Sequence, residues 1–156
     1  LYNLELVHNA GFVHNDLKPD NIMIQNNETT IIDFGFSRSY LEDGIHIENE
    51  DVEKFQGNVF FASHNRMQFK SASRRDDLIS LVYLLVYLLN RGNFLDLDAS
   101  IYDFNHVKET KGMQTLESLC SGKAACLTDF ANGVFSLEFK QTPDYRALSA
   151  LMAKHR

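Results

Sequence analysis

Residues 14–21 read His-Asn-Asp-Leu-Lys-Pro-Asp-Asn, and residues 33–35, twelve positions after that last asparagine, read Asp-Phe-Gly. The stretch between these motifs predicts two short strands, at residues 22–25 and 30–32. The turn between the strands falls on Asn26-Asn27-Glu28. The decisive feature of the sequence is therefore a small β-hairpin with a polar motif at each end.

Apolar spacing predicts helices on both sides of this hairpin. Residues 1–10 carry an apolar side chain at every third position, and Gly11 follows as a C-terminal cap. The longest apolar run, residues 78–89, comes shortly after Ser73-Arg74-Arg75-Asp76, which fits a capping box. Because the apolar residues of this run are not confined to one stripe, we expect its helix to be surrounded by protein.

Two more helices are predicted near the end of the sequence. Residues 127–135 form an apolar stripe, weakened by Gly133, and Thr142-Pro143 resembles an N-cap followed by a first-turn proline. Residues 93–114 show only weak periodicity, and the acid-rich residues 41–54 predict an exposed, mobile loop. The result is a mainly helical (mainly α) domain with one small hairpin near its start.

Length and charge limit the classes of function. The chain has 156 residues, the size of one ordinary domain, and 44% of them are hydrophobic, which supplies a sizeable core. Its net charge of −6 argues against nucleic acid or an anionic membrane as the main partner. As a helix, residues 78–89 would span roughly 18 Å, too little for a bilayer core of roughly 30 Å.

The cysteine count indicates a reducing compartment. Cys120 and Cys126 are too few for a disulfide-stapled scaffold. They could pair with each other, but two reduced core cysteines are the simpler interpretation. We therefore expect a cytoplasmic protein, with a nuclear share as the alternative.

The two motifs resemble the catalytic loop, H-x-D-L-x-x-x-N, and the D-F-G motif of protein kinases. The resemblance implies an α+β kinase-like fold and transfer of the γ-phosphoryl group of ATP. In that chemistry Asp16 orients the attacking hydroxyl and takes its proton, and Lys18 holds charge on the transferring group. Asn21 and Asp33 offer the hard oxygen ligands that Mg²⁺ bound to ATP requires.

Other residues have supporting roles in this resemblance. His14 and Phe34 are expected to pack into an apolar column, and Gly35 completes the D-F-G motif. Asp77 could cap its helix, and the resemblance adds a second role, holding the catalytic-loop backbone from below. Asn58 stands where serine/threonine kinases usually carry a Thr, and its amide is expected to bridge Asp16 and Lys18.

Further stretches resemble the casein kinase I family over almost the whole chain. These are residues 57–65 (GNVFFASHN), 73–81 (SRRDDLISL), 119–122 (LCSG) and 143–145 (PDY). The resemblance implies a serine/threonine protein kinase that acts on protein substrates, uses Mg-ATP and has a monomeric catalytic domain. It also implies that residues 1–156 correspond to the helical C-terminal lobe, with the N-terminal lobe absent from this chain.

Two further substitutions, besides Asn58, depart from the family pattern. Asn15 replaces an Arg that normally grips a phosphate, and the segment between Gly35 and Gly57 has few hydroxyls. We therefore expect activity to be independent of phosphorylation in that segment. Phe60 replaces an Arg of an anion site, which puts a preference for acidic substrates in doubt. Positive charge could still come from four residues, unless they form a solvated basic face: Lys70, Arg74, Arg75 and Lys111.

The sequence also lacks parts that a kinase needs. No two glycines form G-x-G, and no V-A-I-K-like stretch occurs. We expect that the isolated chain binds ATP weakly and does not turn over, which calorimetric titration with nucleotide would test, and that it exposes an apolar face. Three interpretations follow: an incomplete sequence of a working kinase, a pseudokinase-like scaffold or protein-binding module, and a truncated product that does not fold stably.

Overall fold

The computed structural model describes residues 1–95, 97 and 103–154, and these form a mainly α fold. Its α-helices are α1 (Tyr2–Asn9), α2 (His64–Met67), α3 (Arg74–Leu89), α4 (Phe104–Met113), α5 (Leu116–Leu119), α6 (Thr128–Phe135) and α7 (Tyr145–Ala153). Two 3₁₀ helices are η1 (Pro19–Asn21) and η2 (Gly122–Leu127). The strands are β1 (Phe12–Val13), β2 (Ile22–Gln25), β3 (Glu28–Ile31), β4 (Arg38–Ser39), β5 (Leu41–Glu42) and β6 (Ile45–His46).

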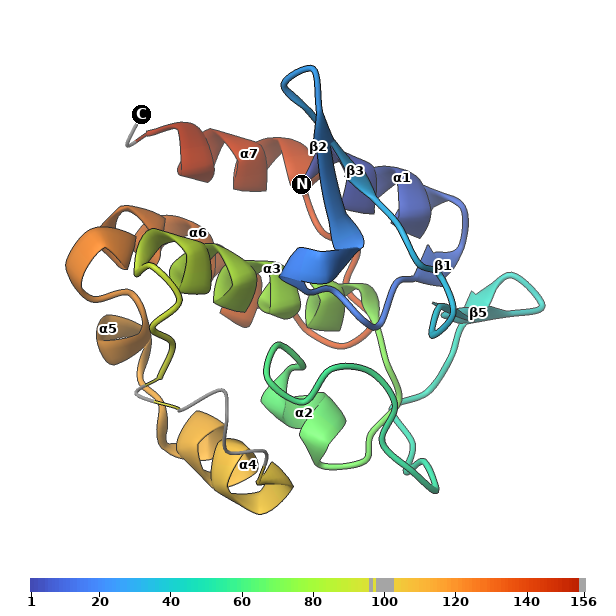
Figure 1. Cartoon of the computed structure of the whole chain (residues 1–156). Coiled ribbons are helices and arrows are strands. Elements are labelled where there is room, and N and C mark those ends of the chain that lie inside the picture. Colours follow the sequence, from blue (N-terminus) through green and yellow to red (C-terminus); the bar gives the residue numbers. More distant parts are fainter. Residues whose placement is uncertain (96, 98–102, 155–156) are drawn as a thin grey trace.

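Helix α3 forms the centre of the fold, with α7 and α1 on one side and α2 and α4 on the other (Figure 1). Its side chains Leu78, Val82, Tyr83 and Leu84 are buried, and it packs against α6, η2 and α1. The expectation of a protein-covered helix is confirmed for most of its length, although Leu88 at its C-terminal end is exposed. Among the described residues, no helix is both long and apolar enough to cross a bilayer.

The predicted hairpin is confirmed as β2 paired with β3. Ile22 lies opposite Ile31 and Gln25 opposite Glu28, so the turn consists of Asn26 and Asn27 alone. Both asparagines have positive φ, the conformation that a two-residue hairpin turn of this twist requires. The second strand therefore begins two residues earlier than the sequence pattern predicted.

The expectation of a single hairpin was wrong, because two more strand pairs form. Strand β1 pairs with β4, and β5 pairs with β6 inside the segment predicted to be a loop. Asp43 and Gly44 turn the β5–β6 hairpin with positive φ, a turn chemistry that the sequence displays. These strands are two residues each, too short for apolar alternation to reveal them.

The helix termini follow local hydrogen bonding. Gly11, with φ of 88°, follows α1 as predicted, and the capping box of α3 is confirmed by a 2.8 Å bond from the Ser73 N–H to Asp76 Oδ2. The predicted start of the last helix was wrong. The N-cap of α7 is Asp144 instead of Thr142, because the Asp144 carboxylate accepts the Ala147 N–H at 2.9 Å.

Residues 93–114 include a helix that their weak periodicity did not predict; residues 96 and 98–102 of this stretch lie outside the described residues. In α4 only Val107 and Lys111 are buried, so a charged residue occupies one of the two core positions and hides the stripe. The predicted stripe is confirmed at Phe130, Ala131 and Val134 of α6, which are buried, but Leu127 lies in η2 and Phe135 is exposed. Cys120 and Cys126 are both free thiols.

Candidate active site

The centre of the candidate site is the buried carboxylate of Asp16, in the loop between β1 and η1. Only 3% of Asp16 is exposed. Its Oδ2 accepts from Asn21 Nδ2 at 3.0 Å and lies 3.1 Å from Lys18 Nζ. Asn21 Nδ2 also donates to the Asp16 carbonyl at 2.8 Å. In the described part of the chain both side-chain contacts fall on Oδ2, so Oδ1 is the oxygen that could receive a substrate hydroxyl.

Asp77, in the first turn of α3, holds the backbone of this loop. Its two carboxylate oxygens accept the N–H groups of His14 at 2.7 Å and Asn15 at 2.8 Å. Asn15 has φ of 64°, a left-handed conformation that asparagine tolerates better than most residues. The loop is therefore fixed from the core side by a buried anion.

A second layer of polar groups supports Asp77. His8 of α1 is buried, and its Nε2 donates to Asp77 Oδ2 at 2.9 Å. A neutral imidazole that donates from Nε2 has a lone pair on Nδ1, and the hydroxyl of Tyr145 on α7 reaches that nitrogen at 2.5 Å. The helices α1, α3 and α7 thus meet in one string of hydrogen bonds beneath the loop.

His14 joins the two motifs. Its Nε2 donates to the carbonyl of Ile32 at 3.1 Å, and its Nδ1 accepts the Asp16 N–H at 3.3 Å. The Phe34 ring meets the His14 ring edge to face, with centroids 5.1 Å apart, but 47% of Phe34 is exposed. The two rings contact each other, but the apolar column around them stays a prediction. His14 also makes hydrogen bonds that the sequence did not reveal.

Asn21 and Asp33 are the residues that could hold a metal. Because Asn21 Nδ2 faces Asp16, its Oδ1 is the atom with ligand chemistry suited to Mg²⁺. Asp33 is exposed, has φ of 61°, and accepts the Gly35 N–H on Oδ1 at 3.1 Å. No group of three His, Cys, Asp or Glu residues suited to a metal occurs in the described chain. One amide and one carboxylate fit Mg²⁺ that takes its other ligands from phosphates and water.

The backbone of Gly57 lies against the loop that carries Asp16. Its φ is 112°, and a Cβ built on it would lie 2.3 Å from the Asn15 carbonyl oxygen, so only glycine fits. The next residue, Asn58, does not act as expected. Its Oδ1 accepts the N–H groups of Phe60 and Phe61 at 2.8 and 3.2 Å, since a turn there leaves both donors without a strand or helix partner.

Lys111 cannot supply positive charge to a substrate, which corrects one alternative. It is buried, and its Nζ donates to the carbonyls of Val59 at 2.9 Å and Ala62 at 2.6 Å. The ammonium lies 4.7 Å from the centre of the Tyr83 ring. Burial holds the pKa of Lys111 well below its usual range.

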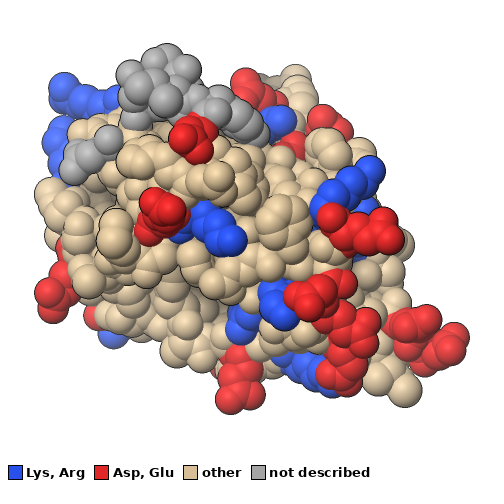
Figure 2. Space-filling view, turned by 90° about the horizontal axis from the view of Figure 1, so that it is seen from below, with Lys and Arg blue, Asp and Glu red and all other residues tan. Residues whose placement is uncertain are grey.

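Each of the other candidate cations also contacts another side chain of the protein, which argues against a basic face of unpartnered charges. Lys70 pairs with Asp51 at 2.7 Å, and the guanidinium groups of Arg74 and Arg75 lie over the rings of Tyr40 and Phe139. Phe60 packs among Phe61, Tyr87 and Phe94. On the face shown in Figure 2, basic and acidic side chains are interleaved, with no continuous basic surface among the described residues.

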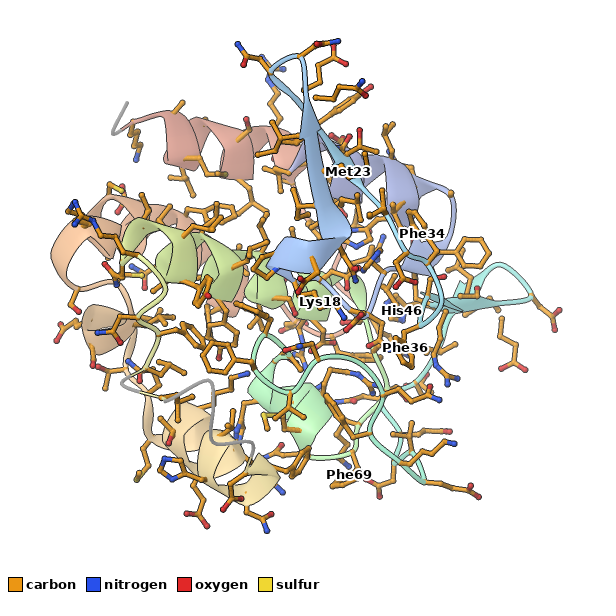
Figure 3. All side chains as sticks on the ribbon, viewed as in Figure 1. Lys18, Met23, Phe34, Phe36, His46 and Phe69 are labelled. Carbon is orange, nitrogen blue, oxygen red and sulfur yellow. The ribbon has the colours of Figure 1, made fainter. Side chains whose placement is uncertain are left out.

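The expected apolar exposure is present around the motifs. Met23 on β2 and Phe34 and Phe36 after β3 are among the exposed large hydrophobic residues. Figure 3 shows Met23 on the hairpin above Lys18, with Phe34 and Phe36 toward the β5 side. A groove of about 310 Å³ beside the hairpin is also largely apolar, with Leu4, Ile22 and Leu85 in its lining.

Three residues that touch the catalytic loop or support it were not predicted from the sequence. His8 and Gly57 have signals that could have been read, a histidine among apolar helix positions and a glycine outside any regular element. Arg66 carries no such signal: it is a buried arginine whose Nε donates to Asn15 Oδ1 at 3.1 Å. A lone arginine in a polar stretch looks like a surface residue in sequence.

Comparison with known proteins identifies the family of the chain. Residues 1–142 match the Pkinase family, described as the protein kinase domain. The chain is 36% identical over 158 residues to a "Probable casein kinase I homolog" of Encephalitozoon cuniculi (strain GB-M1), covering 97% of this chain and 50% of that protein. The chain thus spans about half the length of the curated relative that it matches. It belongs to the protein kinase domain family, and its sequence is casein kinase I-like.

Proposed function

We propose that the full-length protein is a serine/threonine kinase that transfers the γ-phosphoryl group of ATP to hydroxyls of protein substrates. The observation that carries the proposal is the buried Asp16 carboxylate, with Lys18 Nζ and Asn21 Nδ2 both on Oδ2. A carboxylate fixed on one oxygen keeps the other in a constant position, which is what a general base needs. A scaffold would gain nothing from this arrangement.

The proposed roles follow from the contacts. Asp16 Oδ1 accepts the proton of the attacking hydroxyl and orients its oxygen. Lys18 Nζ, held at the same carboxylate, places a positive charge where the phosphoryl group would pass. Asn21 Oδ1 and Asp33 would hold Mg²⁺, which supplies charge neutralisation for the phosphates when bound. The same proposal includes a monomeric catalytic domain and a cytoplasmic protein.

An assay of the full-length protein tests this proposal. Transfer of labelled phosphate from Mg-ATP to casein, followed by phosphoamino-acid analysis, should give phosphoserine or phosphothreonine. Asp16→Asn should lower kcat on the order of 100-fold or more, because it removes the base. Asp20→Asn is the matched control, since Asp20 is an exposed acid of the adjoining η1 and should keep the unvaried rate. Equal rates for Asp16→Asn and Asp20→Asn would contradict the assignment.

A second candidate function is a pseudokinase-like scaffold or protein-binding module. It is favoured by Asn58, whose Oδ1 caps the backbone at Phe60 and Phe61 and leaves that residue's expected bridge between Asp16 and Lys18 unmade. The assay separates the two functions. A scaffold would show no transfer above the Asp16→Asn background at any Mg-ATP concentration.

A further inference from the structure

Arg66, at the end of α2, is a buried cation that forms no ion pair with an acidic residue of the described chain. Only 4% of the residue is exposed, and the ion pairs found among the described residues do not include it. Burial lowers the pKa of Arg66, while the charge of Asp76 acts in the opposite direction. Arginine keeps its charge in proteins, so a buried guanidinium must be held by hydrogen bonds.

The hydrogen bonds of Arg66 lead to the catalytic loop. Its Nε donates to Asn15 Oδ1 at 3.1 Å, and its Nη1 donates to the carbonyl of Lys70. The backbone N–H of Arg66 donates to Ser63 Oγ at 3.1 Å, which fixes the start of the side chain. The guanidinium is therefore held at one end by its own segment and binds the loop residue next to Asp16 at the other.

The guanidinium decides which way the Asn15 amide points. Arginine has only donors, so the Asn15 oxygen must face it and the Asn15 nitrogen must face away. That nitrogen donates to the carbonyl of Phe36 at 3.3 Å. Phe36 lies three residues after Asp33, so the amide connects the loop of Asp16 to the segment that carries the second metal-binding candidate.

Asp33 is thereby held on both sides. The carbonyl of Ile32, just before it, accepts from His14 Nε2 at 3.1 Å, and the carbonyl of Phe36, after it, accepts from Asn15. The segment needs such external contacts because Asp33 and Phe36 are exposed and Asp33 has φ of 61°. If the bond from Asn15 to Phe36 were lost, the bond from His14 to the Ile32 carbonyl would be the one of the two that still attaches the segment to the catalytic loop.

We propose that Arg66 and Asn15 are positioning residues that fix the Asp33 segment relative to Asp16 through the carbonyls of Lys70 and Phe36. We call these four groups the Arg66–Asn15 clamp. The clamp rests on the proposed kinase function for its catalytic consequence. It needs no group from outside the chain, since all of its donors and acceptors belong to residues 15–70.

Asn15→Asp in the full-length protein separates positioning from stability. Aspartate tolerates the left-handed backbone and still accepts from Arg66, now as an ion pair, but it cannot donate to Phe36. We expect half-saturating Mg²⁺ to rise about fivefold at saturating ATP, the ratio expected for one lost hydrogen bond. The thermal midpoint should not fall, because the buried guanidinium gains a charged partner.

Arg66→Met breaks the same connection from the other end. It should raise half-saturating Mg²⁺ by a similar factor, and the Asn15→Asp/Arg66→Met double variant should shift it no more than the larger single change. Arg74→Met is the matched control. Arg74 is half-buried, and its guanidinium contacts Tyr40 and the Lys140 carbonyl instead of Asn15 or Phe36, so Mg²⁺ dependence should be unchanged.

Hydrogen exchange gives a readout that does not need activity. Amides of residues 33–38 should exchange faster in Asn15→Asp and in Arg66→Met than in the unvaried protein or in Arg74→Met. Unchanged exchange together with unchanged Mg²⁺ dependence, even with a lowered thermal midpoint, would overturn the clamp. If the unvaried protein transfers no phosphate, the proposed function fails, and the exchange result alone decides whether the clamp exists.

Discussion

The loop that carries Asp16 and the segment that carries Asp33 differ in how much of the core supports them. Asp16 and Asn21 are both 3% exposed, and Asp77 holds the backbone beneath them. By contrast, Phe34 and Phe36 are 47% and 43% exposed. One half of the candidate site is therefore built by the packing of helices, and the other half depends on a few bonds to the first.

This difference indicates which half limits assembly of the site. Polar groups around Asp16 are satisfied by partners that the core fixes, so their geometry is set when the helices pack. The Asp33 segment is attached by His14 and Asn15, both of which belong to the better-supported loop. The Asp16 loop is therefore positioned by α3, and the Asp33 segment is positioned by the Asp16 loop.

The largest expected effect on stability comes from removing the Asp77 carboxylate beneath the loop that carries Asp16. Asp77→Ala leaves the N–H groups of His14 and Asn15 and the ring of His8 without their acceptor. We expect a loss of about 3–5 kcal/mol in unfolding free energy, the range for removing one partner of a buried charged network. Urea denaturation measures it.

The control for Asp77→Ala is Asp129→Ala. Asp129 is exposed and pairs with Lys154 at 3.3 Å, so its removal should change stability by about 0.5 kcal/mol or less. Similar losses of stability for the two variants would show that the loop carrying Asp16 does not depend on the buried Asp77 for support.

A slightly smaller effect is expected where Gly57 touches the same loop. In Gly57→Ala, the new Cβ would lie 2.3 Å from the Asn15 carbonyl, so the loop or the glycine must move. We expect a loss of about 2–3 kcal/mol, from the combination of positive φ and the clash. Gly44→Ala shares the positive φ but has open space around it, and should lose only about 1 kcal/mol. Equal losses in calorimetric melting would remove the steric argument.

Lys111, which donates to the carbonyls of Val59 and Ala62 just after Gly57, makes the stability of the protein dependent on pH. Burial lowers its pKa in the folded protein below the ordinary 10.5, so between the two values the unfolded chain binds the extra proton. Stability therefore rises with pH in that window, by at most about 1.4 kcal/mol per pH unit. Lys111→Met should remove this rise, which denaturation at a series of alkaline pH values would detect. The exposed Lys123, replaced by Met, should leave it intact, and a rise that persists in Lys111→Met would refute the cause.

The smallest effect on stability is expected in the Asp33 segment. Phe34→Ala removes a ring that is nearly half exposed, and we expect a loss of about 1 kcal/mol or less. Phe130→Ala, in the core beside α3, should lose about 3–5 kcal/mol. If urea denaturation gave Phe34→Ala the larger loss, the Asp33 segment would be part of the core and the contrast between the two loops would be wrong.

Much of the fold could be predicted because local rules agree with the packing. The hairpin between the motifs has strand residues on both sides of two asparagines, and the run at 78–89 is too apolar to be exposed. The capping box before this run predicts where the helix begins. The spacing of residues 14–21 and 33–35 also predicted the candidate site, because the short β2–β3 hairpin between them brings the two motifs together.

The rest could not be predicted because it depends on burial of charged groups. Arg66 and Lys111 are buried cations, yet in sequence each looks like a solvent-facing residue. Their partners are backbone carbonyls and one amide, and no periodicity reports on such acceptors. Asn58 was misjudged for a related reason, since the turn it caps exists only once residues 57–62 pack against the loop.

The string of hydrogen bonds from Tyr145 through His8 to Asp77 has a consequence for the order of folding. Tyr145 and His8 are 137 positions apart, so their contact closes a very long loop of chain. Contacts of that span form late, because their closing entropy is repaid only after local structure exists. During synthesis, residues 14–21 emerge well before α7, yet the last hydrogen bond beneath them forms only after α7 has left the ribosome. The site is thus synthesised before α7 and completed only after α7 has packed against α1.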